Sequence, residues 1–82
     1  MIKVVFFAEL RERLGQSECI IQDFMGATVA DVLRELLQLN PRWHQILSEQ
    51  KMLIAVNHTM SGLSSPVKSG DEIAFFPPVT GG

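Results

Sequence analysis

The chain has 82 residues, of which 46% are hydrophobic and 20% charged, and its formal net charge is −2. This length fits one domain, and the apolar fraction is that of a folded chain rather than a disordered one. One core fits into so short a chain, but a core together with a large internal cavity does not fit easily. The composition therefore favours a carrier, a binding module or a subunit over a self-sufficient enzyme.

Several classes of partner are disfavoured. A nucleic-acid binder needs a concentrated Lys/Arg surface, and the sequence has no basic block. The single Cys19 leaves no internal disulfide and no C-x-x-C spacing, so no metal site is expected. The apolar start meets Glu9 and Arg11 at once, and no run approaches the roughly 20 apolar residues of a membrane span. We expect a cytoplasmic protein that binds neither nucleic acid nor membrane.

The first predicted element is a strand over residues 2–7, which are β-branched and aromatic. Alternation places Ile2, Val4 and Phe6 on one face of this strand. The other face begins with Lys3 and ends with Phe7, so we expect it to be the wetter face and Phe7 to be exposed.

Two short elements follow. Residues 9–14 predict a helical turn that Gly15 closes, since glycine is usual just after a helix C-terminus. A second strand is predicted over residues 18–24, in which Cys19 and Ile21 alternate against their neighbours. A lone cysteine on a strand indicates a small buried hydrophobe rather than a reactive thiol.

The main helix is predicted from Val29 to Leu39. Thr28 is a good N-cap, and Asp31 three residues later resembles a capping box. Apolar residues recur at helical spacing and form one stripe, which comprises Val29, Val32, Leu33, Leu36 and Leu37. Asn40-Pro41 ends the helix, because proline disfavours helical geometry in the residue before it.

The second half of the chain predicts a turn over residues 42–47, with Trp43 and Leu47 folded back onto the core. A third strand is predicted over 52–57, with a turn at Asn57-His58 and a loop through residues 61–71. The last strand is predicted over residues 72–76. Strands, one main helix and further strands around one core indicate a small α+β domain over residues 1–76, followed by a tail over 77–82.

The tail reads Pro77-Pro78-Val79-Thr80-Gly81-Gly82. The prolines offer no backbone N–H to a sheet and favour an extended arm. Gly81 and Gly82 have no side chains, which suits a passage too narrow for a Cβ atom. The group so presented is the α-carboxylate, which must be activated, most economically as an acyl-adenylate, before sulfur or nitrogen can attack it.

Residues 71–82, DEIAFFPPVTGG, resemble the ending of the small subunit of molybdopterin synthase. Three further parts of the chain resemble the same family, in the same order. They are residues 2–8 with Arg11 and Gly15, the stretch Ala55-Val56-Asn57, and residues 69–72. The resemblance covers essentially the whole chain and is weakest over residues 16–26 and 45–51.

This resemblance implies a ubiquitin-like β-grasp fold, a mixed sheet packed on one main helix, and a sulfur-carrier cycle. Gly82 would be adenylated by a ubiquitin-activating-type adenylyltransferase that uses ATP and magnesium, and a sulfur donor would convert it to a thiocarboxylate. The tail, including Pro78, Val79, Thr80 and Gly81, would insert into the large subunit of molybdopterin synthase. It would donate sulfur there to cyclic pyranopterin monophosphate, in a heterotetramer whose catalytic side chains lie on the large subunit. No cofactor would be permanently bound to this chain.

Four residues are predicted to contact partners. Phe7 and Phe76 fall on the less buried sheet face by alternation, and exposed aromatic residues in one patch usually mark a partner surface. The resemblance implies docking through this face, with contacts from Phe7, Arg11, Met60 and Phe76. The alternatives are a second minor core under a loop and, for Arg11, an ordinary solvated residue.

Other functions stay open at this point. The chain could carry sulfur for thiamine or another thio-metabolite, although such carriers generally lack the Phe-Phe-Pro-Pro-Val-Thr sequence before the glycines. It could be a ubiquitin-like modifier whose Gly82 forms isopeptide bonds with lysines. It could also be an interaction module whose two terminal glycines occur by chance at a frayed end.

Overall fold

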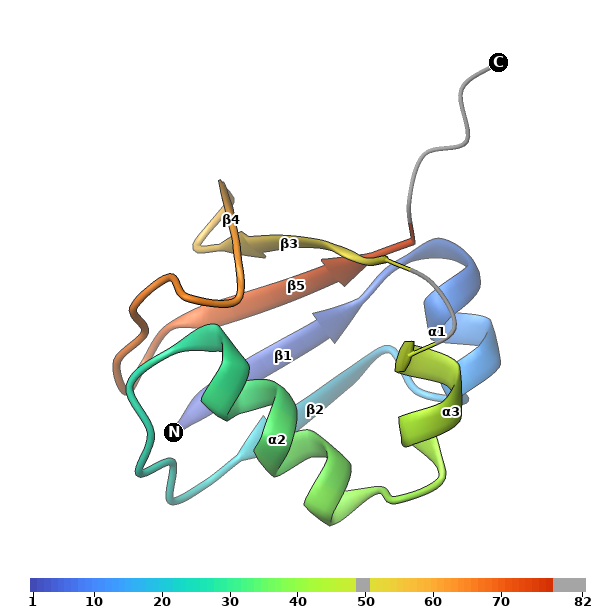
Figure 1. The fold of residues 1–82 in the computed structure, drawn as a ribbon, viewed down its shortest axis with the longest axis horizontal. Helices are drawn as coiled ribbons and strands as arrows, with labels where there is room; N and C mark the ends of the chain where they lie inside the picture. Colours follow the sequence, from blue (N-terminus) through green and yellow to red (C-terminus); the bar gives the residue numbers. More distant parts are fainter. Residues whose placement is uncertain (49–50, 78–82) are drawn as a thin grey trace.

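The fold is a five-stranded mixed sheet with one main helix across one of its faces (Figure 1). The computed structural model describes residues 1–48 and 51–77. The elements are, in chain order, β1 Ile2–Phe6, α1 Ala8–Leu14, β2 Glu18–Ile21, α2 Val29–Leu39, α3 Trp43–Ser48, β3 Leu53–Val56, β4 Thr59–Ser61 and β5 Glu72–Phe76. The predicted α+β class, with a mixed sheet packed on one main helix, is confirmed.

The two terminal strands lie side by side at the centre of the sheet. The strand order is β2-β1-β5-β3-β4, and β1 pairs with β5 in parallel, with Val4 opposite Ile73 and Phe6 opposite Phe75. The other pairs, β1 with β2, β5 with β3 and β3 with β4, are antiparallel. Because β1 and β5 are parallel, both finish at the same end of the sheet, where α1 and α3 also lie (Figure 1).

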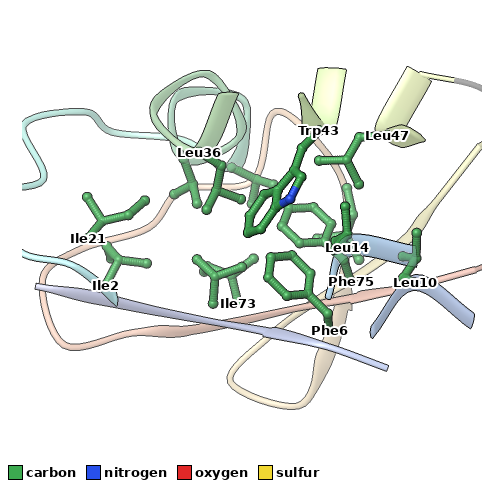
Figure 2. Close-up of a cluster of buried hydrophobic side chains, with 14 of the residues drawn as sticks. Ile2, Phe6, Leu10, Leu14, Ile21, Leu36, Trp43, Leu47, Ile73 and Phe75 are labelled. Carbon is green, nitrogen blue, oxygen red and sulfur yellow. The ribbon is translucent and has the colours of Figure 1, made fainter. Parts of the chain in front are cut away.

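The core lies between the sheet and α2, as the alternation in β1 predicts. The inward side chains of the central strands are almost completely buried, namely Ile2, Val4, Phe6, Ile73 and Phe75. Figure 2 shows Trp43 of α3 reaching toward Phe6, with ring centroids 5.2 Å apart in an edge-to-face arrangement. Edge-to-face rings gain quadrupole attraction beyond their buried area. The predicted return of Trp43 and Leu47 to the core is confirmed.

The predicted bounds of α2 and its capping box are both confirmed. The Asp31 N–H donates to Thr28 Oγ1, and the Asp31 carboxylate accepts from the backbone N–H groups of Ala27 and Thr28 at 2.8 and 3.1 Å. These backbone donors, that of Ala27 first, hold the pKa of Asp31 below its usual value, and Arg34 pairs with the same carboxylate. At the other end the Asn40 N–H bonds the Leu36 carbonyl.

The helical turn at α1 is confirmed, and it starts one residue earlier than predicted, at Ala8. Gly15 follows it with φ of 77°, in the left-handed region that favours glycine. The Gly15 N–H returns to the Arg11 carbonyl at 3.1 Å and so closes the helix.

The predicted end of the second strand at Phe24 is wrong. β2 ends at Ile21, because Ile21 pairs with Ile2, the first residue of β1, and no strand residue remains opposite residues 22–24. The chain turns there instead, and Phe24 packs partly buried against the core. The first and third strands are also slightly shorter than predicted, ending at Phe6 and Val56.

The predicted loop after Asn57-His58 is wrong at its start, since residues 59–61 form a fifth strand, β4. Asn57 and His58 both have positive φ, 48° and 70°. Two such residues form a type I′ turn, whose twist suits a tight hairpin. Thr59–Ser61 therefore folds back onto β3 as an edge strand.

A buried carboxylate joins this turn to the rest of the sheet. Asp71, only 8% exposed, accepts from Asn57 Nδ2 at 3.0 Å and from the Lys68 N–H at 2.9 Å. Asn57 Oδ1 in turn accepts from the Glu72 N–H, and the Asp71 carbonyl accepts from the Lys3 N–H. The hydrogen bond from Asn57, followed by that from Lys68, holds the pKa of Asp71 below its usual value.

Within residues 1–48 and 51–77, no helix is long and apolar enough to cross a membrane. In the same part of the chain, no three His, Cys, Asp or Glu side chains gather into a group that could hold a metal ion.

Trp43→Ala should lower the free energy of unfolding by about 3–5 kcal/mol, because it leaves a cavity over Phe6. His44→Ala, on the exposed side of the same helix, should stay within about 0.5 kcal/mol of the unchanged protein. Urea unfolding followed by circular dichroism measures both. Similar midpoints for the two variants would contradict the placement of Trp43 in the core.

Asp71 should make stability fall in acid. Its pKa is lower when folded than the ordinary 3.8, so the carboxylate stabilises the fold above that pH, and this contribution is lost as the pH falls through the lower, folded value. Asp71→Asn should lower the thermal midpoint at pH 7 and flatten its fall between pH 5 and pH 2. A variant that loses stability in parallel with the unchanged protein over this range would show that Asp71 is not responsible.

Candidate docking face and tail exit

The face of the sheet opposite α2 carries an apolar patch, which we call the outer-face patch. Strand alternation and register bring together side chains from four strands and from the residue after β1. The patch consists of Val5, Phe7, Leu53, Ala55, Met60, Ala74 and Phe76. Of the four residues predicted to contact partners, the structure thus brings Phe7, Met60 and Phe76 onto one face.

Phe7 and Phe76 stack on each other at one end of the patch. Their ring centroids are 5.0 Å apart and their planes are 9° from parallel. Parallel pairing sets Phe6 opposite Phe75, so the next residue of each chain segment also lies side by side, and the Phe7 N–H bonds the Phe75 carbonyl. Phe7 nevertheless remains 42% exposed, as alternation predicts.

Small residues occupy the middle of the patch and large exposed ones its margins. Ala55 and Ala74 pair across β3 and β5 and are each 5% exposed. Leu53 and Met60 are 38% and 63% exposed around them. A surface on which large exposed apolar side chains surround small residues is typical of one that another protein covers.

Most of the charge lies toward the opposite end of the same face, although Glu18 lies opposite Val5 on the edge strand β2. Lys3 pairs with Glu18 at 3.4 Å, and Lys3 lies opposite Glu72, which His58 approaches at 3.5 Å. Following β1 or β5 along its direction, the outer face changes from these charged residues to the stacked phenylalanines. The face is thus polarised, with its apolar part at the end where β5 finishes.

Arg11, the fourth residue predicted to contact a partner, is exposed on α1, the helix that begins just after Phe7. Its carbonyl closes the helix through Gly15. Its partner-contacting role stays a prediction.

The tail leaves the sheet beside the stacked phenylalanines. β5 ends at Phe76, and Pro77, which has no N–H for a further ladder bond, follows it half-buried. The predicted tail residues Pro78, Val79, Thr80, Gly81 and Gly82 lie outside the residues that the structure describes.

The single cysteine of the sequence, Cys19, is not favoured as a nucleophile. Cys19 is half-buried on β2, and burial raises the pKa of its thiol. A raised pKa disfavours the thiolate, which is the nucleophilic form. The prediction that Cys19 is a packing residue is confirmed.

Sequence reasoning missed part of this face. Leu53 next to the buried Ile54 could have been placed outside by alternation, once the third strand was assigned. Ala74 falls on the same face as Phe76 by alternation, as the sequence predicts. Ala55 was not assigned to a face, because a small residue in a strand fits either face. Met60 was named from resemblance alone, since β4 was not predicted.

Comparison with known proteins supports one family. The ThiS family matches residues 4–82. The molybdopterin synthase sulfur carrier subunit of Haemophilus influenzae is 46% identical over 82 residues and covers all of both chains. The fold resembles the small archaeal modifier protein 1 of H. volcanii, with a TM-score of 0.76 and 28% identity over 95% of this chain and 97% of that one.

A third similarity is to a chain in the complex of subunits 1 and 2 of the molybdopterin-converting factor from Helicobacter pylori. The TM-score is 0.65 and the identity 28%, over 99% of this chain and 97% of that one. These ubiquitin-like relatives confirm the predicted β-grasp fold. The chain belongs to the ThiS family and, within it, to the molybdopterin synthase sulfur carrier subunits.

Proposed function

We propose that this chain carries sulfur on the C-terminal carbonyl of Gly82 and delivers it inside a cytoplasmic molybdopterin synthase. The outer-face patch docks on the large subunit, and the tail enters that subunit's active site. One observation carries the proposal: the apolar end of the face coincides with the point where the chain leaves β5, beside Phe7 and Phe76. A partner that covers the patch therefore also receives the tail.

The chemistry needs an activated carboxylate. The Gly82 carboxylate attacks the α-phosphate of ATP on a ubiquitin-activating-type adenylyltransferase, and magnesium pyrophosphate leaves. The terminal sulfur of a persulfide on a donor protein then displaces AMP from the acyl carbon and forms an acyl disulfide. A thiol attacks the donor's own sulfur in this disulfide, so that the thiocarboxylate leaves and the thiol and the donor sulfur become a disulfide. Near neutral pH the sulfur of a thiocarboxylate is a stronger nucleophile than a carboxylate oxygen. The loaded terminus can therefore attack a substrate and transfer its sulfur.

Delivery restores the starting carboxylate. The thiocarboxylate sulfur forms a carbon–sulfur bond to cyclic pyranopterin monophosphate, and the oxygen substituent that it replaces leaves with a proton. Water then cleaves the resulting thioester, which releases the sulfurated product from the Gly82 acyl carbon. Two such transfers build the dithiolene of molybdopterin. The large subunit supplies the proton-transferring side chains, whereas this chain contributes the reactive end and the docking face.

The similarity to a chain of the two-subunit complex from Helicobacter pylori supports a large-subunit partner. The composition of the face supports it as well, because large apolar side chains and aromatic residues characterise the buried centre of protein interfaces. Phe7, Met60 and Phe76 are the contacts expected on this side, with Arg11 at the margin.

Deletion of Gly82 should abolish molybdopterin formation in a reconstituted assay with the large subunit, activating enzyme, ATP and sulfur donor. The thermal midpoint should not change, because every core residue among those that the structure describes lies before residue 77. Gly81→Ala keeps the terminal carboxylate but adds a Cβ in the narrow arm, so it should slow transfer without abolishing it. Full activity of the deletion variant would contradict the proposal.

Phe7→Ser should weaken binding to the large subunit roughly tenfold or more, because it removes one ring of the stacked aromatic pair from the contact. Ile20→Ser is the matched control, since Ile20 is 36% exposed on the same face but at its charged end. Calorimetric titration of each variant with the large subunit measures the effect. Equal losses for the two variants would argue against docking through the aromatic end.

A ubiquitin-like protein modifier is the second candidate, favoured by the similarity to the archaeal modifier protein. In that case the Gly82 acyl carbon would form an amide with a lysine of a target instead of a thiocarboxylate. Conjugates that resist thiol reductants on denaturing gels, and that disappear when Gly82 is deleted, would support this function. Their absence in cells with active molybdopterin synthesis would eliminate it.

A further inference from the structure

β4 is an edge strand with one side open. The strand order leaves β4 next to β3 only. The two-residue turn makes Val56 and Thr59 the hydrogen-bonded pair that closes the hairpin, and hydrogen-bonded pairs alternate with non-bonded ones. Met60, the next residue, therefore directs its backbone N–H and C=O away from β3, toward the open edge.

Apart from its length of only three residues, this edge strand carries no protection against pairing. Natural edge strands are commonly blunted by charged residues, proline or a bulge. Thr59, Met60 and Ser61 contain none of these and continue β3 in regular register. The opposite edge strand, β2, by contrast begins with Glu18, which pairs with Lys3.

An apolar groove of about 620 Å³ lies along the same edge, between β4 and the helices. Its walls come from α2, α3, β3, β4 and the loop after β4. The lining includes Leu33, Leu47, Met52, Ile54, Met60 and Leu63. Leu63 is 50% exposed at its rim, so the groove leaves apolar surface in contact with water.

The loop that forms the outer wall of the groove is held in place by α2. The first N–H groups of that helix lack partners inside the helix. The Ala30 N–H donates to the Leu63 carbonyl at 2.8 Å, and the Val29 N–H donates to the Ser65 carbonyl at 3.0 Å. The groove is therefore preformed, which lowers the entropic cost of filling it.

The groove continues the outer-face patch around the edge of the sheet. Leu53 and Met60 belong to both surfaces. A partner that covers the patch therefore also lies next to the groove. Among the residues that line the groove, the charged one is Lys51, which favours an acidic group on the occupant.

We propose that an extended segment of the large subunit pairs with the open edge of β4 and places an apolar side chain in the groove. This inference rests on the proposed function, since the continuity of the two surfaces identifies the occupant as the protein that covers the patch. Strand addition supplies main-chain hydrogen bonds to Met60, and the alternate side chains of the added strand supply specificity. A carboxylate on the segment would lie within reach of Lys51.

The test compares two exposed leucines in complexes of the full chain with purified large subunit. Leu63→Lys places a charge in the groove and should weaken binding roughly tenfold or more, as expected for a buried contact residue. Leu39→Lys is the matched control, because Leu39 is 57% exposed on the last turn of α2 and does not line the groove. It should stay within about twofold, and thermal melts should show both variants folded.

A second measurement tests the strand pairing. The Met60 amide, directed to water in the free chain, should exchange its hydrogen at least about tenfold more slowly in the complex. Unchanged hydrogen exchange at the Met60 amide would overturn the strand pairing. Equal affinities of Leu63→Lys and Leu39→Lys for the large subunit would overturn the groove contact, even if the two variants differ in their affinity for the adenylating enzyme. Failure of the unchanged chain to bind the large subunit would instead contradict the proposed function.

Discussion

The parallel pairing of β1 with β5 is the constraint on which the rest of the structure depends. It joins the two ends of the folded chain at the centre of the sheet and sets Phe6 opposite Phe75. Parallel strands finish at the same end, so Phe7 and Phe76 meet there and stack. An antiparallel arrangement would have put the end of β5 beside the start of β1, at the charged end of the outer face.

The same pairing gives the two faces of the sheet different roles. Inward side chains such as Ile2 and Ile73 are fully buried and belong to the one core that so short a chain forms. The outer face is then free to remain apolar and exposed where a partner covers it. Asp71, Asn57 and the backbone of Lys3 hold the other end of the sheet together, far from the tail exit.

Much of the fold was predictable because it is local. The bounds of α2 follow from Thr28, Asp31 and Pro41, and the faces of β1 and β5 follow from alternation. β4 and the true end of β2 depend on which strands meet, and a turn without glycine, Asn57-His58, gave a weak hairpin signal. In the candidate site, alternation predicted the exposed Phe7, whereas its stacking on Phe76 depends on parallel pairing between distant segments. The terminal chemistry came from motif and resemblance.

The most direct test of this account is the intact mass of the purified chain after incubation with its activating enzyme, ATP and a sulfur donor. The account predicts a mass increase equal to the replacement of one oxygen by sulfur, located on Gly82 by fragmentation and absent when ATP is omitted. A terminus that gains no sulfur although the activating enzyme adenylates it, or sulfur located on Cys19 instead, would contradict it.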